Sequence, residues 1–214
     1  MYTLDANQAR SADQRGAYIN DTGKYVGEFT RAEEIKSRQG TDGIGFTFKA
    51  KDGRSARFDV YTRKADGSSI KIGMSLVMAL MTCLGQRQMA AKPATVKKWD
   101  GTAGREVDAQ AQCFLELMSK PVGVLLEREE FEKSDGSTGS RMVLVAVFRA
   151  ADELMASEIL DRKVTPEQLG KVTATLKDRP LKGSKAAPVR RTQGGSPDDG
   201  YGDDYSQPDG DFPF

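Results

Sequence analysis

Residues 44–64, IGFTFKAKDGRSARFDVYTRK, decide the fold, because apolar side chains occupy every second position in both halves of the segment. These positions hold Ile44, Phe46 and Phe48 in the first half, then Ala56, Phe58 and Val60 in the second. Such alternation is typical of a β-strand with one buried face. The Asp52-Gly53 pair between the halves favours a tight turn. The segment is therefore predicted to form a β-hairpin whose phenylalanines lie in the core.

The opposite face of this hairpin is basic and contains one aromatic ring. Its side chains come from Lys49, Lys51, Arg57, Tyr61 and Arg63. An ordinary solvated surface is one interpretation of this pattern. The other is a binding surface for a polyanion, because cations attract phosphates and a flat ring can stack on a base.

More strands and a helix are predicted around the hairpin. Alternating or β-branched stretches favour strands at residues 24–37, 122–133 and 140–150. Residues 74–84 are apolar on nearly every side and precede Gly85, which predicts a short buried helix. An Asp-Gly pair within residues 96–106 predicts a projecting hairpin.

Further helices are predicted from apolar residues at helical spacing. Within residues 107–120 the stripe consists of Val107, Ala111, Phe114, Leu115 and Met118, and Pro121 ends it. Residues 151–163 and 165–179 favour a helical hairpin that packs on the sheet or pairs two subunits. In its second helix we expect Thr165 as the N-cap, Pro166 at the first helical position and Gln168 three residues after the cap.

This order of elements predicts a mainly β fold with helices (α+β). The expected architecture is a five-stranded OB-fold-like barrel with a helical insertion, a C-terminal helical hairpin and a disordered acidic tail. An unrelated α+β sheet would give the same order. The expected divisions are a polar lead-in at 1–22, the barrel at 23–150, the helical segment at 151–178, and linker with tail at 179–214.

Charge is distributed unevenly along the chain. All 32 basic residues and 25 of the 31 acidic residues precede Gly194, which leaves residues 1–194 with a net charge of +7. Residues 180–191 hold four basic residues and no acidic one, whereas residues 197–214 hold six aspartates and no lysine or arginine. The basic part suits a polyanionic ligand. The acidic tail either competes for that ligand's surface or binds a separate basic partner.

Several chemistries are disfavoured by composition. The 214 residues include no histidine, which removes Ser-His and Cys-His nucleophiles and most zinc sites. Cys83 and Cys113 are expected to be reduced and buried. We expect no cofactor, no metal and no enzymatic activity. A metal-dependent nuclease is the alternative, because one predicted strand carries four carboxylates, from Glu127, Glu129, Glu130 and Glu132.

The final residues, DGDFPF, resemble the acidic tip of bacterial single-stranded DNA-binding proteins, with Phe212 where those proteins usually carry isoleucine. Residues 23–62, GKYVGEFTRAEEIKSRQGTDGIGFTFKAKDGRSARFDVYT, resemble a diverse group of bacteriophage single-stranded DNA-binding proteins. The resemblance implies an OB-fold that coats single-stranded DNA during phage DNA replication, recombination and repair. It also implies a tip that recruits partner proteins, formed by Asp209, Asp211, Phe212, Pro213 and Phe214.

The predicted function is thus sequence-independent binding of single-stranded DNA. The candidate cations are Arg31, Lys49, Lys51, Arg57, Arg63, Lys97, Lys98 and Arg141, and the candidate stacking rings are Tyr25, Tyr61 and Trp99. Trp99 either stacks on bases or caps the core. The alternatives are a recombination mediator or strand-annealing protein, and an adaptor that binds no nucleic acid. We expect a homo-oligomer, with a dimer favoured, no membrane segment, and a location in the cytoplasm of a bacterial host.

Overall fold

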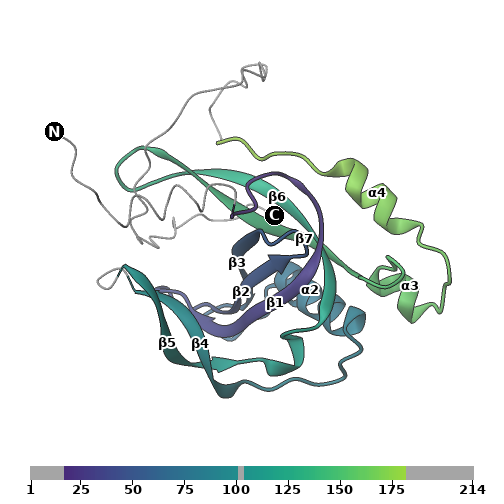
Figure 1. Ribbon diagram of the computed structural model, residues 1–214, viewed down its shortest axis with the longest axis horizontal. Coiled ribbons are helices and arrows are strands. Elements are labelled where there is room, and N and C mark those ends of the chain that lie inside the picture. The colour runs from purple at the N-terminus through teal and green to yellow at the C-terminus, as the bar shows by residue number, and fades with distance from the viewer. Residues whose placement is uncertain (1–16, 101–103, 182–214) are drawn as a thin grey trace.

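The computed structural model describes residues 17–100 and 104–181, and it is mainly β with few helices (Figure 1). All ladders between its strands are antiparallel. The elements are β1 (Gly23–Lys36), β2 (Asp42–Ala50), β3 (Ser55–Arg63), α2 (Lys71–Cys83), β4 (Lys92–Asp100), β5 (Arg105–Cys113), η1 (Leu115–Leu117), β6 (Pro121–Glu132), β7 (Thr138–Arg149), α3 (Ala156–Leu160) and α4 (Gln168–Thr175).

The predicted hairpin is confirmed as β2 and β3. Their register pairs Phe46 with Phe58, and Gly53 in the turn has a φ of +91°, a value that glycine adopts without strain. The alternating apolar residues are all buried in the main core. Three of their rings surround Phe29 of β1, with centroids 4.7, 5.7 and 6.3 Å from its own, and they belong to Phe46, Phe48 and Phe58. This aromatic cluster fixes which side of the hairpin faces outward.

Strand β1 joins the rest of the sheet together because both of its edges are paired. One edge pairs with β2 over residues 27–36, with a bulge between Phe29 and Arg31. The other edge pairs with β6 over residues 23–28 and with β5 at Glu33. Figure 1 shows β1 curving across the molecule between these partners. The resulting path is β3-β2-β1-β5-β4, with β6 paired to the first half of β1 and β7 paired to β6.

The strands predicted at 122–133 and 140–150 are confirmed as β6 and β7. Every residue from Val122 to Glu127 is buried, because β6 has the main core on one side and α4 on the other. Strand β7 approaches β3, and α2 packs against both of them. The main core therefore lies between β1–β2–β3, β6–β7 and α2.

The helix predicted at 74–84 is confirmed as α2, but it is not buried on every side. It buries Val77, Leu80 and Met81 while Ile72 and Met78 remain exposed. The glycine stop is present, since Gly85 has a φ of +66°. Cys83 at its end and Cys113 are free and buried as expected, and burial raises the pKa of the Cys83 thiol to about 12.

The helix predicted at 107–120 is wrong, because the first half of this segment belongs to strand β5 and only Leu115–Leu117 forms a single helical turn. Strands β4 and β5 together form the hairpin predicted at 96–106, which is longer than expected and pairs Lys92 with Cys113. The side chains of β5 alternate between half-buried and exposed from Val107 to Gln112. Pairing along the full length of β4 therefore overrides the helical propensity of its alanines and glutamines. Pro121 begins β6 instead of ending a helix.

The C-terminal helices are present but shorter than predicted. Leu169, Val172 and Leu176 pack with Leu125 and Phe148 on the far side of β6 and β7. In Figure 1, α3 and α4 lie on the right, away from the β4–β5 hairpin. Packing on the sheet was one of the two expected roles of this pair.

The predicted N-cap at Thr165 is wrong, because α4 begins at Gln168 and has no side-chain cap. A buried carboxylate takes that role instead. Glu158 accepts hydrogen bonds from the backbone N–H groups of Met155 (2.9 Å), Glu167 (2.7 Å) and Gln168 (2.9 Å). These bonds hold the pKa of Glu158 below its usual range. No helix among the described residues is long and apolar enough to cross a bilayer.

Candidate functional site

The side of β1, β2 and β3 that points away from the aromatic core is called the outer face here. Strand alternation and register define its members. Arg31 lies opposite Thr47, which in turn lies opposite Arg57. The other residues of the outer face are Glu28, Glu33, Ile35, Gly43, Gly45, Lys49, Ser55, Asp59 and Tyr61. Arg63 is not a member, because it lies opposite Asp42, beyond an irregularity that shifts the register between Asp42 and Gly43. Four of the eleven candidate binding residues thus share one surface, namely Arg31, Lys49, Arg57 and Tyr61.

Two glycines form a strip without side chains along the middle of this face. Gly45 lies between Glu33 and Asp59 in the register, and Gly43 lies opposite Tyr61. A Cβ atom at Gly43 would come within 3.0 Å of Tyr61 Cδ1, and one at Gly45 within 3.2 Å of Asp59 Oδ1. The two glycines therefore leave room for the flanking side chains to lie across β2, and both glycines are buried beneath them.

Tyr61 is half-buried, and its hydroxyl donates a 3.5 Å hydrogen bond to Asp59 Oδ2. Asp59 stays exposed to solvent, yet the surrounding protein desolvates its carboxylate and raises its pKa. Arg31, the Tyr61 hydroxyl and Arg141 oppose this rise by stabilising the charged form. The outer face thus contains a carboxylate with cations nearby, next to its only tyrosine.

Arg31 is largely enclosed, since its side chain is only 18% exposed. Its Nη1 lies 3.8 Å from Glu33 Oε2, a weak ion pair. Its Nε is buried, and among the described residues it has no hydrogen-bond partner. An unsatisfied charged donor is costly to bury, so Arg31 is suited to donating to an incoming anion.

The β4–β5 hairpin brings one further cation to the border of the outer face. Lys98 Nζ lies 2.5 Å from Glu33 Oε1, so its charge is paired. Lys97 projects from the opposite side of β4 and pairs with Asp108 at 2.7 Å. The backbone of Trp99 pairs with Glu106, but its side chain lies outside the described residues. Its two interpretations both remain predictions.

Arg141 and Lys51 lie at other margins of this surface. Arg141 belongs to β7, pairs with Glu129 at 2.7 Å and lies 5.7 Å from the centroid of the Phe131 ring. Its influence on the pKa of Asp59 places it near the β3 edge of the outer face. Lys51 is exposed beside the β2–β3 turn, where its N–H donates to Val26 O at 2.9 Å.

Tyr25 is not on the outer face. It is half-buried and packs against the main core, and burial raises the pKa of its hydroxyl. The guanidinium of Arg54 lies 5.5 Å from its ring centroid, and its hydroxyl donates a 2.7 Å hydrogen bond to Asp21 O. A base could reach this ring only by displacing Arg54.

The carboxylates of β6 have structural partners. Glu127 is buried and accepts hydrogen bonds from Arg179 Nε (2.6 Å) and Lys177 N (3.2 Å). Glu129 pairs with Arg141, as described above. Across residues 17–100 and 104–181, no group of three or more acidic or cysteine side chains is arranged to hold a metal ion.

The sequence prediction left out the acidic members of the site. Glu33 and Asp59 both belong to the outer face, and Glu33 pairs with Lys98 and Arg31. A signal for Asp59 was available, since it alternates with Arg57 and Tyr61 on one strand. Nothing in the sequence indicates that Lys98 reaches Glu33, because that contact depends on how the β4–β5 hairpin joins β1.

The predicted partner-binding tip, residues 209–214, lies outside the described residues, as do residues 1–16 of the predicted lead-in.

Comparison with known proteins does not identify a family for this chain. No family model matches the chain, and no curated protein matches it.

Proposed function

We propose that this protein binds single-stranded DNA without sequence preference through the outer face of β1, β2 and β3. The observation that carries the proposal is the gathering of three cations and one tyrosine on a single sheet surface. Cations that follow the phosphates and a ring on which a base stacks are the two requirements of such binding.

We also infer that the fold is an OB-type barrel with an inserted hairpin. Strands β1–β2–β3 form a meander, α2 follows, and β6 returns to pair with β1. Strand β7 then approaches β3, which nearly closes the barrel. On this view β4 and β5 are the insertion. In OB-folds the face of strands 2 and 3 binds oligonucleotides, which is the location proposed here.

The electrostatics support a binding role in place of catalysis. Arg31 offers an unsatisfied donor, while Lys98 and Arg141 are held by Glu33 and Glu129. Phosphates would have to replace these carboxylates, which lowers affinity and keeps binding reversible. Glu127 accepts hydrogen bonds from Arg179 and Lys177, and Glu129 pairs with Arg141. These two carboxylates of β6 therefore have structural partners, and their presence does not call for a nuclease site.

In this proposal the protein coats and protects single strands during phage DNA replication, recombination and repair in a bacterial cytoplasm. Residues 209–214 would recruit partner proteins, because aspartates beside two phenylalanines suit an apolar pocket with a basic rim. Deleting these six residues should abolish capture of a replication partner and leave DNA affinity unchanged or higher. Equal capture by the shortened chain would contradict the recruiting role.

The decisive experiment is fluorescence anisotropy with a labelled 30-nucleotide oligo-dT, with unlabelled duplex of the same length as competitor. We expect binding that duplex does not displace. Failure to bind at low salt would overturn the proposal and favour an adaptor. Faster pairing of complementary strands in the presence of the protein would favour an annealing protein, and loss of the DNA with magnesium would favour a nuclease.

A further inference from the structure

Helices α2 and α3 carry exposed apolar side chains, and neither helix belongs to the outer face. Ile72 and Met78 of α2 are 78% and 47% exposed, and Leu160 of α3 is 71% exposed. Exposed apolar side chains that gather in one place, unlike scattered ones, mark interaction sites. The part of the chain that the structure describes does not cover them.

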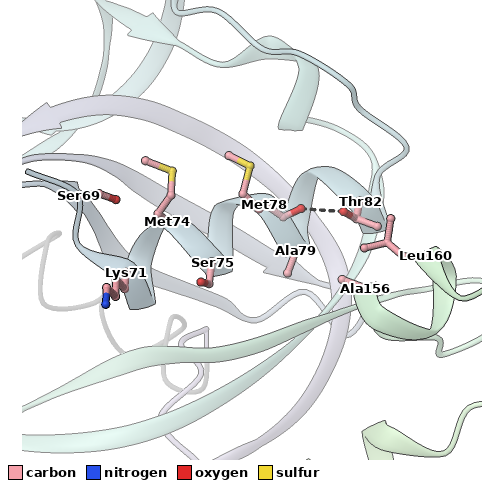
Figure 2. Close-up of a pocket in the computed structure, with 9 residues that line it drawn as sticks. All are labelled: Ser69, Lys71, Met74, Ser75, Met78, Ala79, Thr82, Ala156 and Leu160. Carbon is pink, nitrogen blue, oxygen red and sulfur yellow. Dashed lines mark hydrogen bonds between the residues drawn. The ribbon is translucent and has the colours of Figure 1, made fainter. Parts of the chain in front are cut away.

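Met78 and Leu160 border a groove of about 510 Å³, within the range of about 300–1,000 Å³ of ligand sites, and Ile72 borders an adjoining groove. In Figure 2, Met74 and Met78 lie on one side of α2, Ser75 and Ala79 lie on the other, and Ala156 and Leu160 come from α3. Thr82 is at the far end, where its hydroxyl donates a 2.9 Å hydrogen bond to Met78 O. The small residues leave the helix backbone accessible, and methionine thioethers make favourable contacts with aromatic rings.

The near end of the groove is positively charged. Lys71 is the only charged residue among those that line it, and it also lines an adjoining groove of about 450 Å³. It is the first residue of α2, whose N-cap, Ile70, provides no side-chain hydrogen bond and whose first turn contains no acidic residue. The N-terminal N–H groups of this 13-residue helix therefore lack the carboxylate that usually complements them.

We propose that the groove binds the chain's own segment Asp211-Phe212-Pro213-Phe214. The two rings would lie against Met74, Met78 and Leu160, and the carboxylate of Asp211 would lie at Lys71 and the start of α2. The segment complements both properties of the groove, since residues 197–214 contain six aspartates and no cation. Pro213 lacks an N–H, so burying it leaves no donor unpaired.

The chain is long enough for this contact within one molecule. The described part ends at Leu181, and residues 182–210 can span roughly 3.3 Å each when extended. That reach far exceeds the diameter of a domain of this size. A tether of this kind provides an effective concentration on the order of 1 mM, which is enough for a shallow groove to be occupied.

This inference goes beyond the proposed function and does not require DNA binding. It implies that a partner protein must displace residues 211–214 from α2 before binding them. The apparent affinity of the partner would then equal its intrinsic affinity multiplied by the fraction of tips that are free. Recruitment would respond to anything that occupies the groove.

The test uses NMR of the full chain with 13C-labelled methionine methyl groups. Met74 and Met78 should shift between the wild type and a Phe212→Ala/Phe214→Ala variant, because the aromatic rings leave the groove. Met142, which is buried in the main core, is the internal control and should not move. Unchanged Met74 and Met78 resonances would overturn the proposal, whether or not the protein binds DNA.

A peptide of residues 205–214, titrated into the double-alanine variant, should restore the wild-type methionine positions. Adding Lys71→Gln to this variant should weaken binding of the peptide roughly threefold, which is the size of the effect of one exposed charge at the start of a helix. Lys120→Gln changes a lysine outside the groove and should leave the affinity for the peptide unchanged. Wild-type shifts that fade on dilution would show that the tip comes from a second copy, which would overturn the intramolecular contact.

Discussion

At the scale of single residues, Tyr61 is the side chain on which the proposed binding mode depends most. It is the only aromatic residue on the outer face, and Gly43 leaves space beside its ring. Tyr61→Ala should weaken oligo-dT binding about tenfold, because one base loses its stacking platform. Tyr61→Phe keeps the ring and removes the hydroxyl that donates the 3.5 Å bond to Asp59, so its affinity should stay near wild type. Anisotropy titrations of both variants test this, and equal losses would refute stacking.

Glu33 should act in the opposite direction, because its carboxylate holds Lys98 at 2.5 Å and lies 3.8 Å from Arg31. Glu33→Gln releases both cations for phosphates, so oligo-dT should bind about threefold more tightly. The slope of log K against log salt should steepen by roughly 0.7, the value for one added phosphate contact. Glu34→Gln is the matched control, since the neighbouring Glu34 projects from the other side of β1. An equal gain in oligo-dT affinity in both variants would mean that the lost negative charge, and not the release of Lys98 and Arg31, explains the effect.

At the scale of elements, α3 and α4 depend on the Glu158 carboxylate, which holds three backbone N–H groups. Its pKa is lowered in the folded state, so its stabilising effect is present above the ordinary glutamate pKa and is lost as pH falls through the folded value. Glu158→Gln should therefore lower the melting temperature at pH 7, and the difference from wild type should shrink below about pH 4. Hydrogen exchange at Glu167 and Gln168 should accelerate at neutral pH.

The control for that experiment is Glu153→Gln, which removes a surface ion pair between Glu153 and Lys24 at 2.8 Å. Exposed pairs contribute little to stability, so this variant should melt close to wild type at both pH values. A gap between Glu158→Gln and wild type that stays constant from pH 7 to pH 3 would mean that charge is irrelevant to the capping.

The elements also show what the sequence could predict. Period-2 alternation located β2, β3, β6 and β7, because a strand with one buried face must alternate. The same alternation runs from Val107 to Cys113, but residues with high helical propensity obscured it, and only pairing with β4 made it a strand. The cap of α4 was unpredictable for a related reason, since Glu158 lies nine residues before Glu167 and acts through the tertiary fold.

At the scale of the whole molecule, the charge of the basic part could favour DNA without any specific surface. Residues 1–194 carry a net charge of +7, and diffuse attraction alone would give salt-sensitive binding. The sequence placed Lys49 and Arg57 on one face of the hairpin, but it did not predict that Arg31 joins them or that Arg63 lies on the other side, because both depend on bulges in the strand register. An experiment is therefore needed to distinguish binding through the outer face from diffuse attraction by the net charge.

Two triple variants with equal charge change separate these cases. Arg31, Lys49 and Arg57 belong to the outer face, and replacing all three with glutamine should reduce the salt slope by about 2, at roughly 0.7 per phosphate contact. Lys133, Lys171 and Lys177 are exposed elsewhere, and the same replacement there should leave the slope nearly unchanged. The slopes come from anisotropy titrations between about 50 and 300 mM salt. If both triple variants lose the same amount, affinity follows net charge, and the outer face has no special role in binding.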